Sequence, residues 1–310
     1  MAKLTVTRAD FFASIQDMGR RQTQHMGLAQ SGVADEHSFF RANYLVGNNL
    51  ATPVIEIITG LFSITTDVPV TMALTGADMS ATLNKIPLSP WQSFVLMPGK
   101  LLEINNSRGN GIYGYLAVKG GLEIDLCFNS ASTVEREQLG GYQGRKLAVG
   151  DELTTILDRP LCPTLSTPPD QIPQFDRPLT LRIMPGYDHD SFPDEAKQMF
   201  LSSEYTVTTR IDRTGIRLEG PPIVWGQGDI LSKPVALGVV QITNDGAPVV
   251  LLKERQTTGG YPMIGVVSRL DLFKLVQAFP GTPIYFALAD PLRLRSELMR
   301  FYNFWGALDS

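Results

Sequence analysis

Short runs of β-branched and aromatic residues, each bounded by Gly, Pro, Asn or Asp, recur along almost the whole chain. Such runs are typical of β-strands, and their close spacing is typical of barrels and sandwiches. With 28 glycines and 21 prolines among 310 residues, the composition also favours many turns over a helical bundle. We therefore predict a mainly β fold, with strands at residues 54–58, 70–74, 94–97, 101–104, 113–118, 179–184, 205–209, 239–242, 249–252 and 283–288.

A few short helices are expected between these strands. Asp35 has the residue type of an N-cap for the first of them, and Asp271 is predicted to open the third. Asp290 precedes a proline at the first position of the last, which is a common start for a helix. The predicted helices cover residues 36–46, 193–201, 271–278 and the C-terminal segment from 291 onward.

A proline-rich segment at residues 158–178 divides the chain. Its six prolines suppress both helix and central strand, so it is predicted to connect two domains. At ~100–200 residues per domain, the length of the chain is consistent with two. The predicted boundaries are an N-terminal domain at 1–160, a linker at 161–178 and a C-terminal domain at 179–310.

Composition restricts the class of partner. The formal net charge of −4 argues against nucleic acid or an anionic membrane as the main partner. Charged residues make up 19% of the chain, below the usual ~25%, so part of the surface is expected to contact another chain. The N-terminus lacks a signal-peptide layout, and no apolar run approaches the ~20 residues that cross a bilayer. We predict a cytoplasmic protein.

Several familiar motifs are absent or misleading. The segment 109–114, GNGIYG, matches G-x-G-x-x-G, but a strand follows it where a dinucleotide site needs a helix. No phosphate-binding G-x-x-x-x-G-K-[ST] loop and no G-x-S-x-G nucleophile elbow occurs. The three histidines form none of the usual ligand spacings, so no metal site is predicted.

The segment at 254–262 has the composition of a ligand-binding loop. Gly259 and Gly260 allow the backbone to approach a ligand and offer N–H donors. The alternative is a plain hairpin turn with Tyr261 packed in the core, and the residue types leave both interpretations open. The side chains that could bind a ligand, or in the case of the glutamate act as a base, are Glu254, Gln256, Thr257, Thr258 and Tyr261.

Charged residues elsewhere have functional and structural interpretations. Arg213 or Arg217 could bind a carboxylate or phosphate in bidentate fashion, or be held by a neighbouring acid. Asp17 and Arg20 are expected to form an ion pair that fixes the N-terminal turn. Glu56 lies in an apolar strand, where a carboxylate must be paired, exposed on the polar face, or functional with a raised pKa.

These segments, taken in order, resemble the allophanate hydrolase subunit 2 family of biotin-dependent carboxyltransferase-like proteins. The matching motifs extend from residue 3 to about residue 288, which is nearly the whole chain. They are IQDMGR at 15–20, SGVAD at 31–35, ANYLVGN at 42–48, VIEI at 54–57, LTGAD at 74–78, YLAVKGG at 115–121, GGYQGRKLAVGD at 140–151, DRTGIRLEG at 212–220 and QTTGGYP at 256–262.

The resemblance implies two cyclophilin-like β-barrel domains with a few short helices. It also implies a partner, the family's subunit 1 protein, which is the B-type chain of 5-oxoprolinase, together with an A-type chain. Relatives open 5-oxoproline to glutamate with ATP, transfer a carboxyl group from biotin to urea, or antagonise a kinase inhibitor. A separate chain of this length is most similar to the member found in 5-oxoprolinase. ATP is then the expected cofactor, in a pocket that a partner chain shares or supplies, and biotin on another protein is expected only for the carboxyltransferase.

The chemistry that the resemblance implies suits the candidate residues, although it does not assign an individual role to each. A five-membered lactam is a poor electrophile, and converting its oxygen to a phosphate leaving group assists its hydrolysis. The site must also hold a carboxylate and stabilise an oxyanion with N–H donors. The predicted catalytic residues are Glu254, Gln256 and Tyr261. The predicted substrate-binding residues are Arg213, Arg217, Thr257, Thr258, Gly259, Gly260, Glu56, Asp17 and Arg20.

Overall fold

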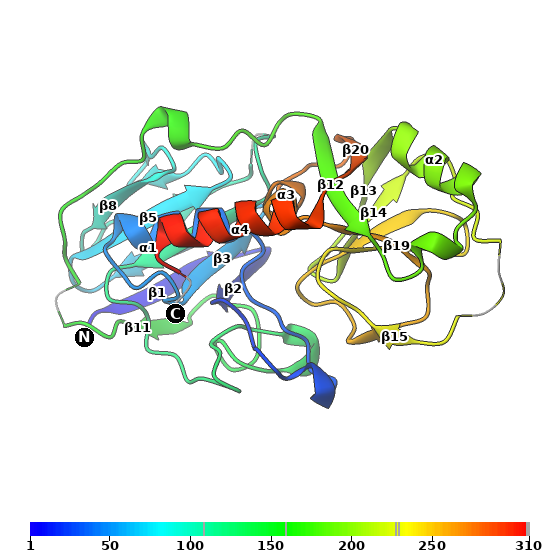
Figure 1. The fold of residues 1–310 in the computed structure, drawn as a ribbon. Helices are drawn as coiled ribbons and strands as arrows, with labels where there is room; N and C mark the ends of the chain where they lie inside the picture. Colours follow the sequence, from blue (N-terminus) through cyan, green and yellow to red (C-terminus); the bar gives the residue numbers. More distant parts are fainter. Residues whose placement is uncertain (108, 159, 227, 229, 308–310) are drawn as a thin grey trace. The chain divides into compact units, whose positions relative to one another are not determined.

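The computed structural model describes residues 1–107, 109–158, 160–226, 228 and 230–307 (Figure 1). The chain forms two compact units, the first from residues 1–21 and 31–175 and the second from residues 22–30 and those from 176 onward. Strands dominate both units, so the mainly β class with few helices is confirmed. No helix among the described residues is long and apolar enough to cross a membrane.

The first unit is built from two antiparallel sheets. One has the strand order β11-β1-β4-β9-β6-β7 and the other β2-β3-β10-β5-β8. Apolar side chains from both sheets, including the fully buried Leu4, Ile15 and Leu74, form one core. The strands are β1 Lys3–Ala9, β2 Phe12–Gln16, β3 Val54–Ile58, β4 Phe62–Thr66, β5 Val70–Gly76, β6 Thr82–Leu83, β7 Ile86–Pro87, β8 Gln92–Leu96, β9 Leu102–Ile104, β10 Tyr113–Val118 and β11 Glu152–Thr154.

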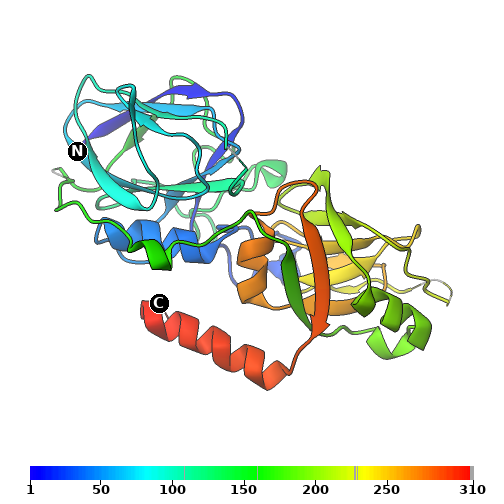
Figure 2. The same cartoon turned by 90° about the horizontal axis from the view of Figure 1, so that it is seen from above.

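Helix α1 (Glu36–Leu45) packs on β5 and β10 of the five-stranded sheet (Figure 2). The predicted cap is confirmed, since the carboxylate of Asp35 accepts from the Ser38 backbone N–H at 3.2 Å and from its hydroxyl at 2.5 Å. Past the end of the helix Gly47 adopts a φ of +63°, a conformation that favours glycine. Both ends of this helix therefore follow from local sequence.

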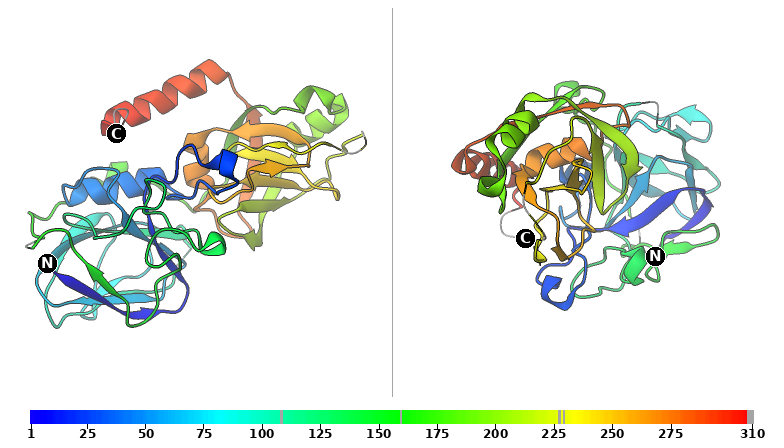
Figure 3. Two further views of the ribbon diagram at one scale, coloured as in Figure 1. Left: turned by 90° about the horizontal axis from the view of Figure 1, so that it is seen from below. Right: turned by 90° about the vertical axis from the view of Figure 1, so that its right-hand side faces the viewer.

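The second unit contains a closed barrel with the strand order β12-β19-β16-β17-β14-β13-β20 (Figure 3). Strands β12 and β20 pair in parallel, whereas the other neighbours in the barrel are antiparallel. The elements are β12 Leu179–Pro185, α2 Asp194–Ser202, β13 Tyr205–Ile211, β14 Gly215–Glu219, β15 Lys233–Pro234, β16 Val239–Ile242, β17 Pro248–Leu251, β18 Thr258–Gly259, β19 Met263–Val267, α3 Arg269–Leu275, β20 Pro283–Leu288 and α4 Pro291–Trp305. Four single-turn 3-10 helices complete the described elements, at Gln24–Met26, Glu135–Glu137, Pro169–Gln171 and His189–Ser191.

The predicted start of α3 is wrong. The helix begins at Arg269 with Ser268 at its N-cap, so Asp271 lies inside the first turn. The carboxylate of Asp271 accepts instead from the backbone N–H and the guanidinium of Arg182, at 2.8–2.9 Å. A long-range ion pair, which local sequence does not reveal, therefore determines the position of this acid.

The first part of the proline-rich segment packs along the five-stranded sheet. The backbone N–H of Thr71 donates to the carbonyl of Pro160, and that of Ser93 donates to the carbonyl of Leu165, both at 2.8 Å. Prolines suit such an edge because the carbonyls still accept while no ladder N–H is lost. The predicted domain limits at 160 and 179 stay a prediction.

Candidate functional site

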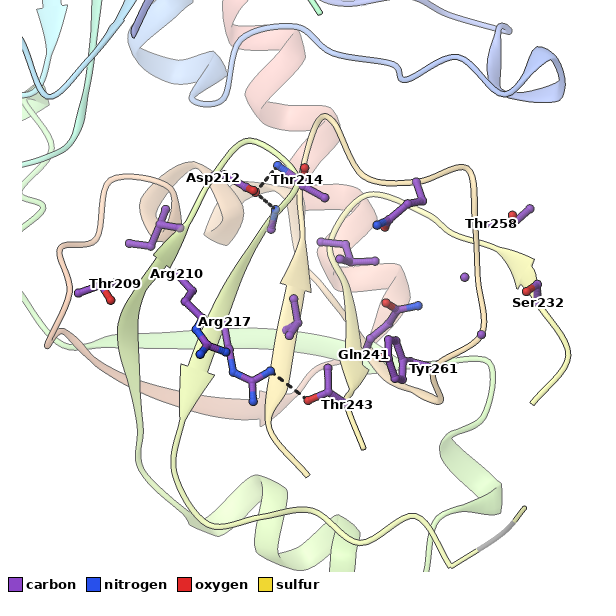
Figure 4. Close-up of a pocket in the computed structure, with 17 residues that line it drawn as sticks. Thr209, Arg210, Asp212, Thr214, Arg217, Ser232, Gln241, Thr243, Thr258 and Tyr261 are labelled. Carbon is purple, nitrogen blue, oxygen red and sulfur yellow. Dashed lines mark hydrogen bonds between the residues drawn. The ribbon is translucent and has the colours of Figure 1, made fainter. Parts of the chain in front are cut away.

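A pocket of about 580 Å³ lies on the barrel of the second unit (Figure 4). Strands β13, β14, β16 and β17 and the loop that contains β18 supply its walls. The lining residues are Thr209, Arg210, Ile211, Asp212, Thr214, Gly215, Arg217, Ser232, Gln241, Thr243, Val249, Leu251, Gln256, Thr258, Gly259, Gly260 and Tyr261. Six of the predicted site residues therefore meet in one hollow: Arg217, Gln256, Thr258, Gly259, Gly260 and Tyr261.

The QTTGGYP loop does not continue the barrel ladder. Its strand β18 pairs with β15 as a separate two-stranded sheet, with Gly259 opposite Lys233. The carbonyl of Thr257 accepts from the Val235 backbone N–H at 3.0 Å, which also ties this loop to the segment around β15. Tyr261 is 40% exposed and lines the pocket, so the alternative in which it packs in the core is wrong.

Glycine at position 259 leaves space beside a buried amide. Neither Gly259 nor Gly260 has a positive φ, so their backbone would accept other residues. A Cβ at position 259, however, would lie 2.7 Å from Nε2 of Gln241. Gln241 is 5% exposed, and this Nε2 has no hydrogen-bond partner among the described residues. The glycine thus allows the loop to lie directly against the Gln241 amide.

Arg217 reaches the pocket from β14 with its charge partly engaged. Its guanidinium donates to the hydroxyl of Thr243 at 3.2 Å and forms an ion pair with Asp245. A hydrogen bond from Thr243, and to a smaller extent the charge of Arg217, lower the pKa of the Asp245 carboxyl. Arg217 can therefore still donate to a ligand, but part of its charge is already balanced.

Three predicted site residues of the second unit, Arg213, Glu254 and Thr257, lie outside the pocket lining. The guanidinium of Arg213 forms an ion pair with the carboxylate of Glu254, and the two side chains are 6% and 14% exposed. The Glu254 backbone N–H also donates to the Arg213 carbonyl at 2.8 Å. This pair joins the turn before β14 to the loop after β17, and a base role for Glu254 would require it to leave the arginine. Their predicted catalytic and binding roles stay predictions.

The predicted residues of the first unit are bound into its interior. The carboxylate of Asp17 accepts from the backbone N–H groups of Gly19 and Ala131 and from the hydroxyls of Ser130 and Ser132, at 2.5–2.8 Å. Four donors saturate this carboxylate. The expected ion pair with Arg20 is not formed among the described residues, because the guanidinium of Arg20 donates to the Ser132 carbonyl and its Nε and Nη1 have no partner.

Glu56 is also fully buried, in strand β3. Its carboxylate accepts from the Ala34 backbone N–H at 2.8 Å, and so fixes the segment before α1. Nearby, the hydroxyl of Tyr115 accepts from the Asp35 backbone N–H at 2.8 Å. Burial, followed by the charges of Glu56 and Asp35, raises the pKa of Tyr115 well above its usual value. Of the possibilities for Glu56, pairing inside the fold is the one observed.

Several pocket residues were missed by the sequence reasoning. Gln241 lies in the fully buried strand β16, where an isolated amide in an apolar run was the available signal. Arg210 lies in β13 and had no motif around it. Among the described residues no group of three His, Cys, Asp or Glu side chains could hold a metal ion.

The fold and the pocket define a mainly β protein with a pocket on a closed barrel. The family model described as carboxyltransferase domain, subdomain A and B, matches residues 26–288. The chain belongs to this family, and the resemblance drawn from its motifs is confirmed.

Named relatives agree with this assignment. The chain is 32% identical over 289 residues to the 5-oxoprolinase C subunit of Haemophilus influenzae, covering 92% of each chain. It is 30% identical over 304 residues to the 5-oxoprolinase C subunit of Escherichia coli, covering 97% of this chain and 96% of the relative. The solved structure of K. lactis urea amidolyase matches with a TM-score of 0.89 at 25% identity, covering 97% of this chain and 20% of the larger protein.

Proposed function

We propose that this chain is the C-type subunit of a 5-oxoprolinase and that it binds the lactam substrate in the pocket of its second unit. The observation that carries the proposal is the match to the two relatives named as C subunits of 5-oxoprolinase, which extends over more than nine tenths of both partners. By contrast, urea amidolyase is about five times longer than the part that this chain matches.

The pocket residues suit a small cyclic amide that carries a carboxylate. Arginine side chains at one wall can bind the carboxylate. Gln256, Thr258 and Tyr261 offer neutral donors and acceptors to the ring amide. The Gly259–Gly260 segment lines the pocket, and the proposal uses the backbone N–H of Gly260, which follows β18, for a developing oxyanion. The proposal assigns this chain binding, orientation and oxyanion stabilisation.

The nucleotide is expected in a pocket that a partner chain shares or supplies. The sequence has no phosphate-binding loop of its own. We therefore derive no ATP step on this chain. The proposed partners are a subunit 1 protein, which is the B-type chain of the enzyme, and an A-type chain, since a C-type subunit implies a complex.

The test is phosphate release in a mixture of the three purified proteins. The chain alone should be inert, and the mixture should hydrolyse ATP only when 5-oxoproline is present. Gln256→Ala should lower this coupled rate, because it removes a pocket side chain without touching the barrel core. A ternary mixture without any 5-oxoproline-dependent phosphate release contradicts the proposal.

A second candidate is a carboxyltransferase that uses biotin carried by another protein. The likeness to K. lactis urea amidolyase, and 32% identity over 319 residues to a putative urea carboxylase of Emericella nidulans, favour it. The chain has no A/V-M-K-M biotin-accepting motif, so a separate carrier would be needed. Carboxylation of urea by the chain with a biotinylated carrier would select this function. A purely non-catalytic partner role is selected if Gln256→Ala or Arg217→Gln preserves the complex and every measurable activity.

A further inference from the structure

A bulge in β13 lies at the edge of the pocket. β13 and β14 are paired at Val207↔Leu218, and the register then shifts before Ile211↔Ile216. Residues 208–210 therefore face a single residue of β14, Arg217. Bulges of this kind redirect side chains, and they are common next to functional sites.

Hydrogen bonds hold the bulge in shape. The hydroxyl of Thr208 donates to the Arg217 carbonyl at 2.8 Å and accepts from the Arg210 backbone N–H at 3.2 Å. Thr208 thereby joins the two arginines through their backbones. Both arginine side chains line the pocket, and both also line a groove of about 430 Å³. Figure 4 shows the two guanidinium groups beside each other at one wall.

The two arginines differ in how far their charge is balanced. Arg217 pairs with Asp245, whereas the guanidinium of Arg210 makes no ion pair or hydrogen bond with the residues that the structure describes. The one carboxylate in the pocket lining, that of Asp212, accepts from the backbone N–H groups of Thr214 and Gly215 at 2.7 and 3.0 Å. Arg217 therefore already has a paired acid and Asp212 is held by backbone donors, so Arg210 is the arginine whose guanidinium is open to a ligand.

We propose that Arg210 is the residue that anchors the ligand's carboxylate, with Arg217 as its neighbour on the same wall. This inference rests on the proposed function in taking the ligand to be a small cyclic amide acid. A bidentate carboxylate matches the planar guanidinium of Arg210, which has no ion pair or hydrogen bond among the described residues. The neighbouring groove that both arginines line also contains Glu219 and Asp245, whose negative charges disfavour a phosphate dianion there.

The test compares ligands that carry or lack the carboxylate. Calorimetry measures the binding of three ligands to the full chain and to the three-protein mixture. The first is 5-oxoproline, and the second is 2-pyrrolidinone, which keeps the lactam and lacks the carboxylate. The third is cyclopentanecarboxylate, which keeps the carboxylate and lacks the lactam. Arg210→Gln should weaken both carboxylates about 10- to 100-fold and change 2-pyrrolidinone less than about twofold. Arg210→Lys keeps the charge and should recover part of the loss. Arg300→Gln, an exposed arginine of α4, is the control for net charge.

Each outcome decides between the two proposals. In the active mixture, Arg210→Gln should raise KM for 5-oxoproline and leave kcat nearly unchanged, as expected of an anchor rather than a catalytic residue. Two results with Arg210→Gln overturn the inference: equal weakening of the binding of all three ligands, or an unchanged KM for 5-oxoproline. Two results with the wild type also overturn it: no binding of either carboxylate, or displacement of 5-oxoproline by inorganic phosphate that depends on Arg210. A further result separates the two proposals. If the mixture has no 5-oxoprolinase activity but cyclopentanecarboxylate binds in a way that depends on Arg210, the role of Arg210 as carboxylate anchor is supported and the proposed function is contradicted.

Discussion

In the first unit the carboxylate of Asp17 accepts from four donors inside the fold, whereas in the second unit the guanidinium of Arg210 faces a pocket. Both residues are charged and lie in β-rich segments, yet their surroundings differ. A saturated buried carboxylate stabilises a loop, while an exposed cation without a partner is available to a ligand. The comparison favours a structural role for Asp17 and is consistent with the proposal that the ligand pocket lies in the second unit.

The largest effect is expected from replacing the saturated carboxylate. Asp17→Asn places an amide donor among groups that already donate, so it should lower the free energy of unfolding by about 3 kcal/mol or more. Asp10→Asn is the matched control, because Asp10 is 47% exposed and pairs with Arg8 at the surface. It should change stability by less than about 0.5 kcal/mol. Urea unfolding of the two variants measures the difference, and equal values would remove the contrast between the units.

A smaller effect is expected where the loop meets Gln241. Gly259→Ala should push the loop or the Gln241 amide aside, because the new Cβ would lie 2.7 Å from Nε2. We expect about a tenfold loss of ligand affinity and a cost of about 1–2 kcal/mol in stability. In Gly260→Ala the nearest atoms to the new Cβ are 3.5 and 3.6 Å away, which is ordinary contact, so this variant should keep the stability of the wild type. Calorimetry and thermal unfolding of both variants test this, and equal losses would show that the amide is not the cause.

The smallest effect concerns a buried hydroxyl of the barrel. Tyr205 is fully buried, and its hydroxyl has no hydrogen-bond partner among the described residues. Burial raises the pKa of this hydroxyl to about 12. Between pH 10 and 12 the unfolded chain loses this proton while the folded chain keeps it, so stability falls as pH rises through that range. Tyr205→Phe should remove this contribution to the fall in stability between pH 10 and 12. At pH 7 it should change the free energy of unfolding by about 1 kcal/mol at most, and an increase is expected. Denaturant titrations at pH 8 and pH 11 measure both, and an unchanged pH slope would contradict the assignment.

The fold was predictable where local sequence determines it. The strands β3, β10, β16 and β20 have the predicted limits, because each is an apolar run between turn residues. The start of α3 was not predictable, since Asp271 binds Arg182, which lies 89 residues away. Local residue types describe caps and turns, but they contain no information on such distant partners.

The site shows the same division. The loop at 256–262 was predicted as a unit because its glycines, threonines and tyrosine are contiguous. Arg210 and Gln241 were not, since a bulge in β13 and the closure of the barrel bring them to the pocket. The pairing of Arg213 with Glu254 was hidden for a similar reason, because 41 residues separate them.

The parallel pairing of β12 with β20 has a consequence for how the second unit is synthesised. β20 lies between β12 and β13, and Ile284 is paired with Leu179 on one side and with Tyr205 on the other. A ribosome releases β12 about a hundred residues before β20, so the nascent barrel remains open on both of these edges until its last strand emerges. Open strand edges attract other chains, and contacts of long sequence separation form slowly. The edges of β12 and β13 therefore stay open to other chains until β20 pairs with both of them.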